Sequence, residues 1–407
     1  MSEQQLNLVH WPRRHVLLAS LLVAIVGMAV RIYPSAGFTG VGYDEALYGR
    51  YVGDLITHGL TSYPDFADYY VERQQQLPGA ILPPTRFLYI FAGYLWHNIT
   101  GAAPVTALHQ VSCLFSILLL FAAGAFAWRL GGSTVALAVF ALMACAPTQI
   151  HMAQHALIDG FFAFWATLCL WFLWENLRRP NDARWLAAYT VALGLMVLTK
   201  ENAAFAYLGL LALLLANRWL RIGKITPSLL LLTIAGPLAG MLLLVTLCGG
   251  VGTFISTYRL LTAKASVLPY AIATGDGPWY RYLVDLLLMS PLVFLFAWGA
   301  IFRLRRSDTK SIYLLTFMIA TYAVMCNVRY GMNLRYTNMW DMPMRYLTVT
   351  CVFDLTQPAV RRRTLLVITI IAVLCAVDLR QYYIFFVGHN LYELVTAGLL
   401  RALQILK

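Results

Sequence analysis

Long apolar runs alternate with short polar segments along almost the whole chain. Most runs approach the length of about 20 residues that an α-helix needs to cross the hydrocarbon core of a bilayer. Because the backbone must satisfy its own hydrogen bonds in lipid, the runs predict membrane-spanning helices. The predicted spans are 16–33, 105–128, 134–150, 160–176, 184–199, 203–217, 227–248, 282–302, 311–327, 340–356 and 364–386.

The composition agrees with this pattern. The chain has 407 residues, of which 60% are hydrophobic and 12% are charged, whereas soluble domains carry about 25% charged residues. The seven cysteines lie in or beside apolar runs without a C-x-x-C pair, which favours core packing over disulfides or zinc. The sequence therefore predicts an all-α integral membrane protein with about eleven transmembrane helices in a single domain, 1–407.

The basic residues predict which side of the membrane each loop occupies. Four basic clusters are separated from one another by two predicted spans each, so they share one side. The positive-inside rule makes that side cytoplasmic. The net charge of +12 is thereby explained by topology, which removes the argument for a nucleic-acid partner. The clusters begin at Arg178, Arg218, Arg303 and Arg361.

One further apolar run, about 83–99, is ambiguous because it begins with Pro83 and Pro84 and contains Arg86. If it crossed the membrane, the basic N-terminus would lie outside and the acidic segment 44–72 would lie inside. We therefore predict a helix in or along the outer leaflet.

This topology predicts a multi-pass plasma (inner) membrane protein with a cytoplasmic N-terminus. The segment 34–104 becomes a long non-cytoplasmic first loop, and 387–407 becomes a short outer tail. Loops as long as the first are uncommon without a function, so we expect an active site on the periplasmic or extracellular side.

Asp44 and Glu45 follow the first span directly. Successive residues do not share a helix face, so one carboxylate can face a substrate while the other caps the N-terminus of an amphipathic helix at 45–58. The alternative is that both carboxylates only cap this helix.

His151, His155 and Asp159 are spaced by four residues. On a helix that spacing would stack them on one face, where two imidazoles and a carboxylate could bind a metal. No Glu follows the first His, so this is not a metalloprotease motif. The alternative is that Asp159 only caps the next span.

Two basic sites lie on the predicted outer side. Lys200 and Glu201 occupy the tip of a tight hairpin between two spans. Arg329 and Arg335 form the second site, beside Tyr336, and their charge violates the positive-inside rule. Such charge needs an acidic partner or an anionic ligand such as a lipid phosphate. The alternatives are a Lys200–Glu201 pair at the interface and an ion pair between Arg335 and the acidic first loop.

The order of these motifs resembles the GT-C superfamily of integral membrane glycosyltransferases. The similarity is to glycosyltransferase family 39, which includes protein O-mannosyltransferases and the bacterial lipid A aminoarabinose transferase. It extends from about residue 10 to 386. Two departures affect donor and acceptor preference: Leu82 replaces a common His or Lys, and 337–341 replaces a proline-rich continuation. The matching blocks are Asp44-Glu45, Leu82-Pro83-Pro84, His155 to Asp159, Leu198-Thr199-Lys200-Glu201, Gly277-Pro278-Trp279-Tyr280 and Leu334-Arg335-Tyr336.

The resemblance implies a GT-C bundle with amphipathic helices in the first outer loop. It also implies a polyprenyl-phosphate sugar donor and an inverting single displacement onto a lipid, glycan or protein acceptor. Asp44, Glu45 and Asp159 are the predicted catalytic residues, and Arg335, Tyr336 and Lys200 are predicted to bind the donor phosphate. Asp44, His155 and Asp159 are also the candidate ligands of a divalent metal cation, which the reaction would not require.

The alternative function is a transporter or flippase for a lipid-linked precursor. That class needs polar residues near the midplane of several spans. The acidic residues of the predicted spans, among them Glu175, Asp285 and Asp378, lie mostly near span ends. This pattern favours the glycosyltransferase.

Overall fold

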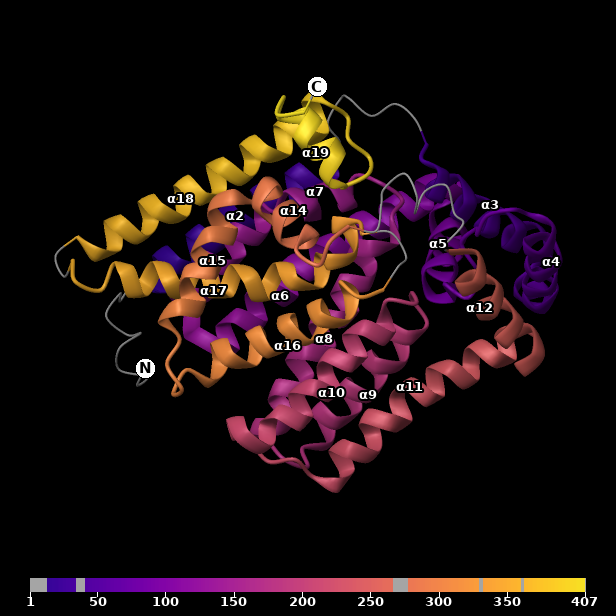
Figure 1. Ribbon diagram of the computed structural model, residues 1–407, viewed down its shortest axis with the longest axis horizontal. Helices are drawn as coiled ribbons and strands as arrows, with labels where there is room; N and C mark the ends of the chain where they lie inside the picture. Colours follow the sequence, from indigo (N-terminus) through magenta and orange to yellow (C-terminus); the bar gives the residue numbers. More distant parts are fainter. Residues whose placement is uncertain (1–12, 34–40, 266–276, 329–331, 360–361, 407) are drawn as a thin grey trace.

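The apolar runs form helices that pack side by side (Figure 1). The computed structural model describes residues 13–33, 41–265, 277–328, 332–359 and 362–406, and in these ranges it contains helices and no strand. Within the described residues, six helices are long and apolar enough to span a membrane, and three shorter apolar helices accompany them. The predicted all-α bundle is confirmed, and the number of eleven spans stays a prediction. The six are α2 (Arg13–Ile32), α6 (Pro104–Ala144), α8 (Ile158–Arg178), α10 (Ala203–Leu220), α11 (Pro227–Leu247) and α18 (Arg363–Tyr382), and the three are α9 (Ala183–Val197), α15 (Pro291–Arg303) and α16 (Thr309–Met325).

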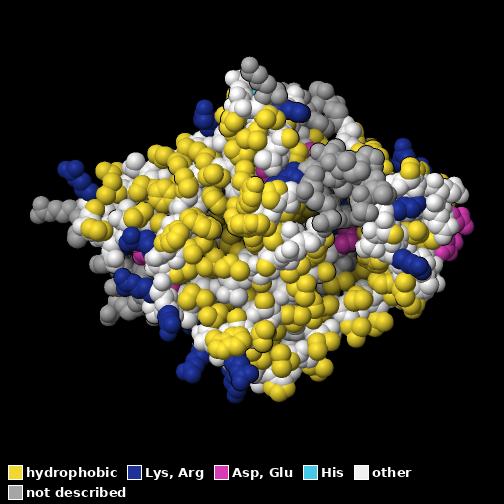
Figure 2. All heavy atoms as spheres, in the orientation of Figure 1, with side chains coloured by type: hydrophobic (Ala, Val, Ile, Leu, Met, Phe, Trp, Pro, Cys, Tyr) yellow, Lys and Arg dark blue, Asp and Glu magenta, His cyan; other side chains and the backbone are white. Residues whose placement is uncertain are grey.

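The outer surface of the bundle is apolar. Figure 2 shows hydrophobic side chains over much of the visible face and Lys and Arg side chains along its lower left edge. Helix α11 illustrates the pattern, since Leu231 and Leu242 on it are 67% and 59% exposed. Exposed leucines in such numbers fit lipid as the solvent.

Helix α6 is a helical hairpin. At Gly132 the backbone has φ 80°, a conformation that favours glycine, and the chain reverses there. The rings of Phe121 and Phe140 lie 5.5 Å apart, whereas nineteen residues of straight helix would separate them by about 28 Å. The predicted spans 105–128 and 134–150 are therefore two antiparallel helices, but the second ends at Ala144, and α7 (Pro147–Ala153) follows it.

The predicted span 282–302 is interrupted. Helix α14 (Arg281–Met289) ends before Ser290, which has φ −138° and ψ 67°, and α15 begins at Pro291. Proline lacks a backbone N–H and is favoured at the first helical position, so it begins α15 and prevents α14 from continuing.

The first loop folds into helices: α3 (Tyr43–His58), a 3₁₀ turn, α4 (Tyr63–Gln76) and α5 (Phe87–Thr100). The amphipathic helix predicted at 45–58 is α3, and the ambiguous run at 83–99 is a helix from Phe87 onward. A Cβ at Gly93 of α5 would lie 2.6 Å from Leu108 of α6, so these two helices touch closely. Together with α12 (Val251–Ala265), these helices form a lobe beside the bundle (Figure 1).

The segment predicted as an outer tail is packed into the structure. The buried Leu394 accepts a hydrogen bond from the backbone N–H of Leu334 at 2.9 Å. Thr396, at the start of α19 (Thr396–Ala402), donates to Asp285 of α14 at 2.6 Å. Residues 391–394 thereby lie beside the 3₁₀ helix η2 (Leu334–Trp340), which leads into α17 (Asp341–Leu355).

A buried charged network anchors η2. Arg345 of α17 contacts Asp341 at 2.6 Å and Asp378 of α18 at 2.8 Å, and it is fully buried. Thr148 and Gln149 of α7 donate to the other oxygen of Asp341 at 2.8 and 2.6 Å. Asp378 lies near the end of α18, as the sequence indicated, but the protein encloses it completely. The network ties α7, α17 and α18 together at the base of η2.

Candidate active site

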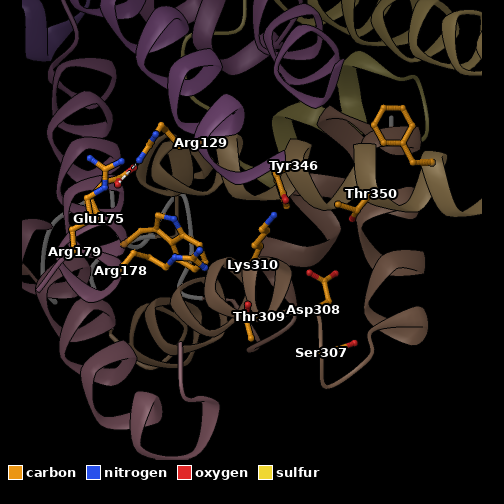
Figure 3. Close-up of a pocket in the computed structure, with 12 residues that line it drawn as sticks. Arg129, Glu175, Arg178, Arg179, Ser307, Asp308, Thr309, Lys310, Tyr346 and Thr350 are labelled. Carbon is orange, nitrogen blue, oxygen red and sulfur yellow. Dashed lines mark hydrogen bonds and ion pairs between the residues drawn. The ribbon is translucent and has the colours of Figure 1, made fainter. Parts of the chain in front are cut away.

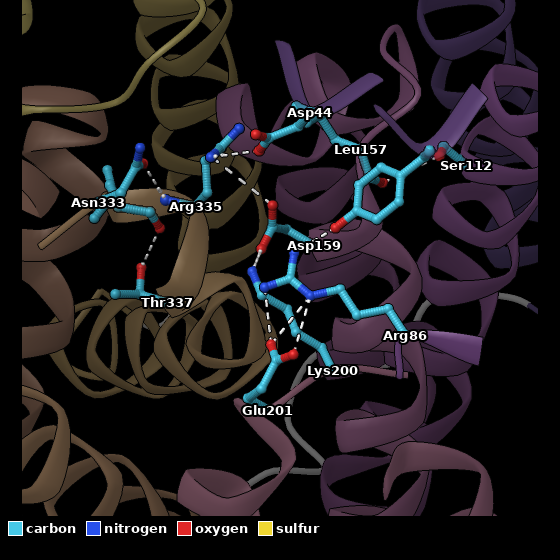
Figure 4. Close-up of polar contacts among 12 residues, drawn as sticks. Asp44, Arg86, Ser112, Leu157, Asp159, Lys200, Glu201, Asn333, Arg335 and Thr337 are labelled. Carbon is cyan, nitrogen blue, oxygen red and sulfur yellow. Dashed lines mark hydrogen bonds and ion pairs between the residues drawn. The ribbon is translucent and has the colours of Figure 1, made fainter. Parts of the chain in front are cut away.

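Arg335 is the centre of a cluster of charged side chains from distant parts of the chain (Figure 4). It lies in η2, where Asn333 accepts the backbone N–H of Arg335 at 3.0 Å and so caps the helix. Its guanidinium lies 3.2 Å from Asp44, 3.8 Å from Asp159 and 3.5 Å from Glu393. The arginine side chain is only 4% exposed, so its charge is held by these carboxylates in a poorly hydrated environment.

Asp159 connects Arg335 to a second cation. Its other carboxylate oxygen accepts a hydrogen bond from Lys200 at 2.6 Å, and both side chains are buried. The ammonium of Lys200 also lies 4.3 Å from the centre of the Tyr336 ring, in cation–π distance. Burial lowers the pKa of Lys200, and Asp159 only partly opposes this shift. The turn between α9 and α10 thus supplies a cation beside Arg335.

Arg86 is a third buried cation, on the other side of Lys200 (Figure 4). It forms a two-nitrogen contact with Glu201, at 2.8 Å from Nη2 and 3.1 Å from Nε, and it donates to the Tyr48 hydroxyl. Although burial alone would raise it, the pKa of Glu201 is lowered because Arg86 stabilises the carboxylate. Lys200 and Glu201 therefore pair with Asp159 and Arg86, which disfavours the alternative of a pair between the two.

Tyrosine hydroxyls from the first-loop helices fix the segment that delivers Arg86. Tyr51 donates to the Leu82 carbonyl at 2.7 Å, and Tyr63 donates to the Pro84 carbonyl. The N–H of Leu88 then donates to the Leu198 carbonyl at 2.9 Å, which joins the start of α5 to the turn that carries Lys200. Since proline has no N–H to donate, this proline-containing segment relies on its carbonyls for anchoring.

Asp44 and Glu45 point to different partners, as expected for successive residues. Glu45 is buried and accepts hydrogen bonds from the backbone of Gly42 and Ala156, both at 2.8 Å, and from His155 at 3.1 Å. Burial would raise the pKa of Glu45, but the His155 and backbone hydrogen bonds outweigh it and lower that pKa. Glu45 thus holds α3 against the turn between α7 and α8. Asp44 has a 21% exposed side chain beside Arg335.

The expectation that His151, His155 and Asp159 stack on one helix face is wrong. The helix breaks after Ala153, so His151 lies in α7, His155 lies in the turn and Asp159 lies in the first turn of α8. Leu157 and not Asp159 occupies the N-cap position of α8, and no side-chain cap forms there.

The two imidazoles lie 4.5 Å apart and have separate partners. His151 donates through Nε2 to the Tyr392 carbonyl at 3.2 Å, while Nδ1 of His155 bonds to Glu45. Within the described ranges, no group of three or more His, Cys, Asp or Glu residues is arranged to hold a metal ion. The divalent cation stays a prediction.

The structure brings together five of the six predicted catalytic and phosphate-binding residues, whereas Glu45 points to His155 and the backbone beside it. The five are Asp44, Asp159, Lys200, Arg335 and Tyr336. Arg329 falls outside the described residues. Sequence reasoning missed Arg86 and Glu393 as members of the cluster, and also Tyr392, whose ring centre lies 5.7 Å from the guanidinium carbon of Arg335. A cation inside an apolar run was a usable signal for Arg86. Glu393, by contrast, lies in a segment that the sequence predicts to be an outer tail, and its contacts with Arg335 and Asn333 place it in the cluster.

An apolar cavity of about 330 Å³ opens between α14, α15, α16 and α17. Trp340, at the end of η2, lines it together with apolar side chains of these helices. Since Arg335 lies at the start of the same short helix, η2 connects the charged cluster to an apolar groove.

The sequence model for dolichyl-phosphate-mannose-protein mannosyltransferases matches residues 22–262, more than half of the chain. That region contains Asp44, Arg86, Asp159 and Lys200. No curated protein sequence matches the chain.

Several solved structures share the fold. ArnT from Cupriavidus metallidurans in the apo state has 14% identity and a TM-score of 0.57 over 92% of this chain and 76% of its own. The apo oligosaccharyltransferase of Archaeoglobus fulgidus has 15% identity and a TM-score of 0.64 over 94% of this chain. The archaeal oligosaccharyltransferase AglB from the same organism, solved with an inhibitory peptide and a dolichol-phosphate, has 15% identity and a TM-score of 0.60 over 93%. This chain spans only 57% and 56% of these two oligosaccharyltransferase chains.

Proposed function

This chain belongs to the dolichyl-phosphate-mannose-protein mannosyltransferase family of GT-C membrane glycosyltransferases, and on that premise we propose that it transfers a hexosyl or pentosyl group from a polyprenyl-phosphate donor to an acceptor on the non-cytoplasmic face. The observation that carries the proposal is Arg335, which contacts the accessible carboxylate of Asp44 and the buried Asp159–Lys200 pair at once. A candidate base and two phosphate-binding cations thus meet at one point.

Asp44 is the proposed general base. Its oxygen accepts the proton of the acceptor hydroxyl while the hydroxyl oxygen bonds to C1 of the sugar. The bond between C1 and the phosphate oxygen breaks in the same step, so the configuration at C1 inverts and polyprenyl phosphate leaves with the electron pair. The departing phosphate needs no proton, because it leaves as an anion.

Arg335 and Lys200 stabilise the charge that grows on that phosphate. Arginine matches a phosphate with two parallel N–H donors, whereas lysine acts as a compact charge. Both side chains are at most 4% exposed, so the interaction is stronger than it would be in water. Asp159 holds the two cations at a fixed spacing, and Tyr336 supports Lys200 through its ring. Glu45 orients α3, and with it Asp44.

The groove beside Trp340 suits the polyprenyl tail of the donor. Its lining is almost wholly apolar, and η2 places it next to the charged cluster. A lipid-linked donor needs this combination of an apolar groove and a phosphate site. The proposed acceptor is a lipid, a glycan or a protein, and the three share the attacking hydroxyl.

The test is a transfer assay with purified protein and a panel of polyprenyl-phosphate sugars, in which released polyprenyl phosphate is quantified. We expect release from one donor and a loss of on the order of 10²-fold or more in Asp44→Asn. Asp65→Asn, which neutralises an exposed acid of α4, is the matched control and should keep wild-type release.

Two outcomes would contradict the proposal. Normal turnover of Asp44→Asn would end the assignment of the base. Silence across the panel, with folded protein and membrane lipids supplied as acceptors, would favour a transporter or flippase of a lipid-linked precursor.

A further inference from the structure

A polar cavity lies at the opposite end of α8 from the charged cluster. Asp159 lies in the first turn of α8 and Arg178 is its last residue, and nineteen residues of helix correspond to about 28 Å. The cavity has a volume of about 480 Å³, within the usual range for small-ligand sites. Its lining comes from α6, α8, α16 and α17 and from the segment before α16. Its lining residues are Arg129, Trp174, Glu175, Arg178, Arg179, Ser307, Asp308, Thr309, Lys310, Tyr346, Thr350 and Phe353.

Cations line both walls of this cavity. Figure 3 shows Arg178 and Arg179 on one wall, with Lys310 across from them. These side chains lie on the predicted cytoplasmic side, but the positive-inside rule requires only that loops be basic. It does not require cations to converge on a cavity from helices far apart in the sequence.

The two carboxylates of the cavity already have structural roles. Glu175 binds Arg129 through both oxygens, at 2.6 and 2.8 Å, and also accepts the Trp171 indole N–H at 3.2 Å. Asp308 is the N-cap of α16 and accepts the backbone N–H of Ser311 at 3.2 Å. The four cations of the lining outnumber these two carboxylates, so the lining has a net positive charge.

Arg178 is held in a geometry suited to an oxyanion. Its guanidinium carbon lies 5.5 Å from the centre of the buried Trp174 ring. Contact of the cation with an aromatic face leaves the N–H donors at the edge of the guanidinium plane for hydrogen bonding. Hydroxyl groups of Thr309, Tyr346 and Thr350 line the same cavity and can donate hydrogen bonds.

We propose that this cavity binds a phosphate group, carried either by an anionic phospholipid or by a soluble phosphorylated compound. Basic pockets between transmembrane helices on the cytoplasmic side bind lipid headgroups. The aromatic wall of Trp174, Tyr346 and Phe353 also fits the glycerol and upper acyl region of a lipid. The ligand joins α8 to α16 and α17, and its binding is separate from sugar transfer.

The test uses full-length protein, delipidated in a neutral detergent. Binding of a fluorescent short-chain phosphatidylglycerol is titrated at fixed ionic strength, with inorganic phosphate as competitor. The variant Arg178→Gln/Lys310→Gln removes one cation from each wall. The matched control, Arg218→Gln/Lys224→Gln, removes an exposed Arg and an exposed Lys outside the cavity on the same predicted side. Thermal unfolding checks that both variants fold.

We expect the cavity variant to bind phosphatidylglycerol about 10–30-fold more weakly, while the control stays within twofold of wild type. If millimolar phosphate then displaces the probe from the wild type but not from the variant, the site serves soluble phosphate compounds. If phosphate does not compete, the ligand is the lipid headgroup. Equal affinities for wild type and cavity variant, or an equal loss in the control, would overturn the proposal.

Discussion

Asp44 and Arg335 are 291 residues apart in the chain, yet their side chains meet at 3.2 Å. In the proposed reaction, Asp44 faces the acceptor hydroxyl while Arg335 faces the leaving phosphate, and the sugar lies between them. The contact must therefore open when substrates bind. Asp159 and Glu393 keep Arg335 in place while that happens, because they contact it from other segments.

The fork geometry of Arg335 should matter more than its charge. Arg335→Lys keeps the charge but has a single ammonium that cannot reach three carboxylates and a phosphate. We expect kcat/KM to fall on the order of 10²-fold in Arg335→Lys, and further in Arg335→Gln. Release of polyprenyl phosphate measures both. Wild-type turnover of Arg335→Lys, with an unchanged unfolding midpoint, would show that the fork is unnecessary.

Arg86 and Glu201 should behave as one coupled unit. Removing either partner leaves a mostly buried charge uncompensated, so the losses of stability in Arg86→Met and Glu201→Gln should add up to more than the loss in the double variant. We expect a coupling energy of about 1–3 kcal/mol in a double-mutant cycle of unfolding free energies. Strictly additive effects would mean that the contact contributes nothing to the turn that carries Lys200.

His151 should make stability depend on pH. Burial, together with the nearby His155 and Arg335, lowers the pKa of His151 well below its ordinary value. The unfolded chain then binds a proton at this histidine more readily than the folded protein does. The contribution of neutral His151 to the free energy of unfolding is therefore fully present above about pH 6.5 and decreases as the pH falls below that value. Glu45, whose pKa is also lowered, acts in the same direction but only below about pH 4.5.

Thermal unfolding at pH 7.5 and 5.5 measures this effect. The midpoint of the wild type should fall on acidification, and His151→Gln should fall less because glutamine keeps an N–H donor without titrating. His58→Gln changes an exposed histidine and should behave as the wild type. If His151→Gln shows the same acid sensitivity as the wild type, the charge of His151 is not the cause.

Chelation tests the divalent cation. Asp44, His155 and Asp159 contact Arg335, Glu45 and Lys200 respectively, and the donor's phosphate has Arg335 and Lys200 as partners. We therefore expect sugar transfer to stay within about twofold after chelator treatment, because the cations of the protein supply the electrostatic stabilisation. A loss that Mg²⁺ or Mn²⁺ restores would assign a metal to this cluster.

The sequence was most informative where a local rule applied. The divergence of Asp44 and Glu45 follows from helix geometry, and the turn at Lys200 follows from two short apolar runs. The sequence was misleading where a four-residue spacing was interpreted as one continuous helix, as for His155 and Asp159, because the helix breaks after Ala153. Long-range contacts such as Arg335 to Glu393 depend on how the chain after α18 folds back, and no local pattern encodes that.

Two carboxylates of the cluster, those of Asp44 and Asp159, are synthesised well before the arginine that neutralises them in the folded protein. Asp44 is made early, and Arg335 follows 291 positions later, about 15–60 s at ordinary rates of synthesis. During that interval Asp44 and Asp159 have no Arg335 to neutralise them. Lys200 follows Asp159 after 41 residues and can pair with it, so until Arg335 arrives it is the carboxylate of Asp44 that must stay hydrated at the membrane surface.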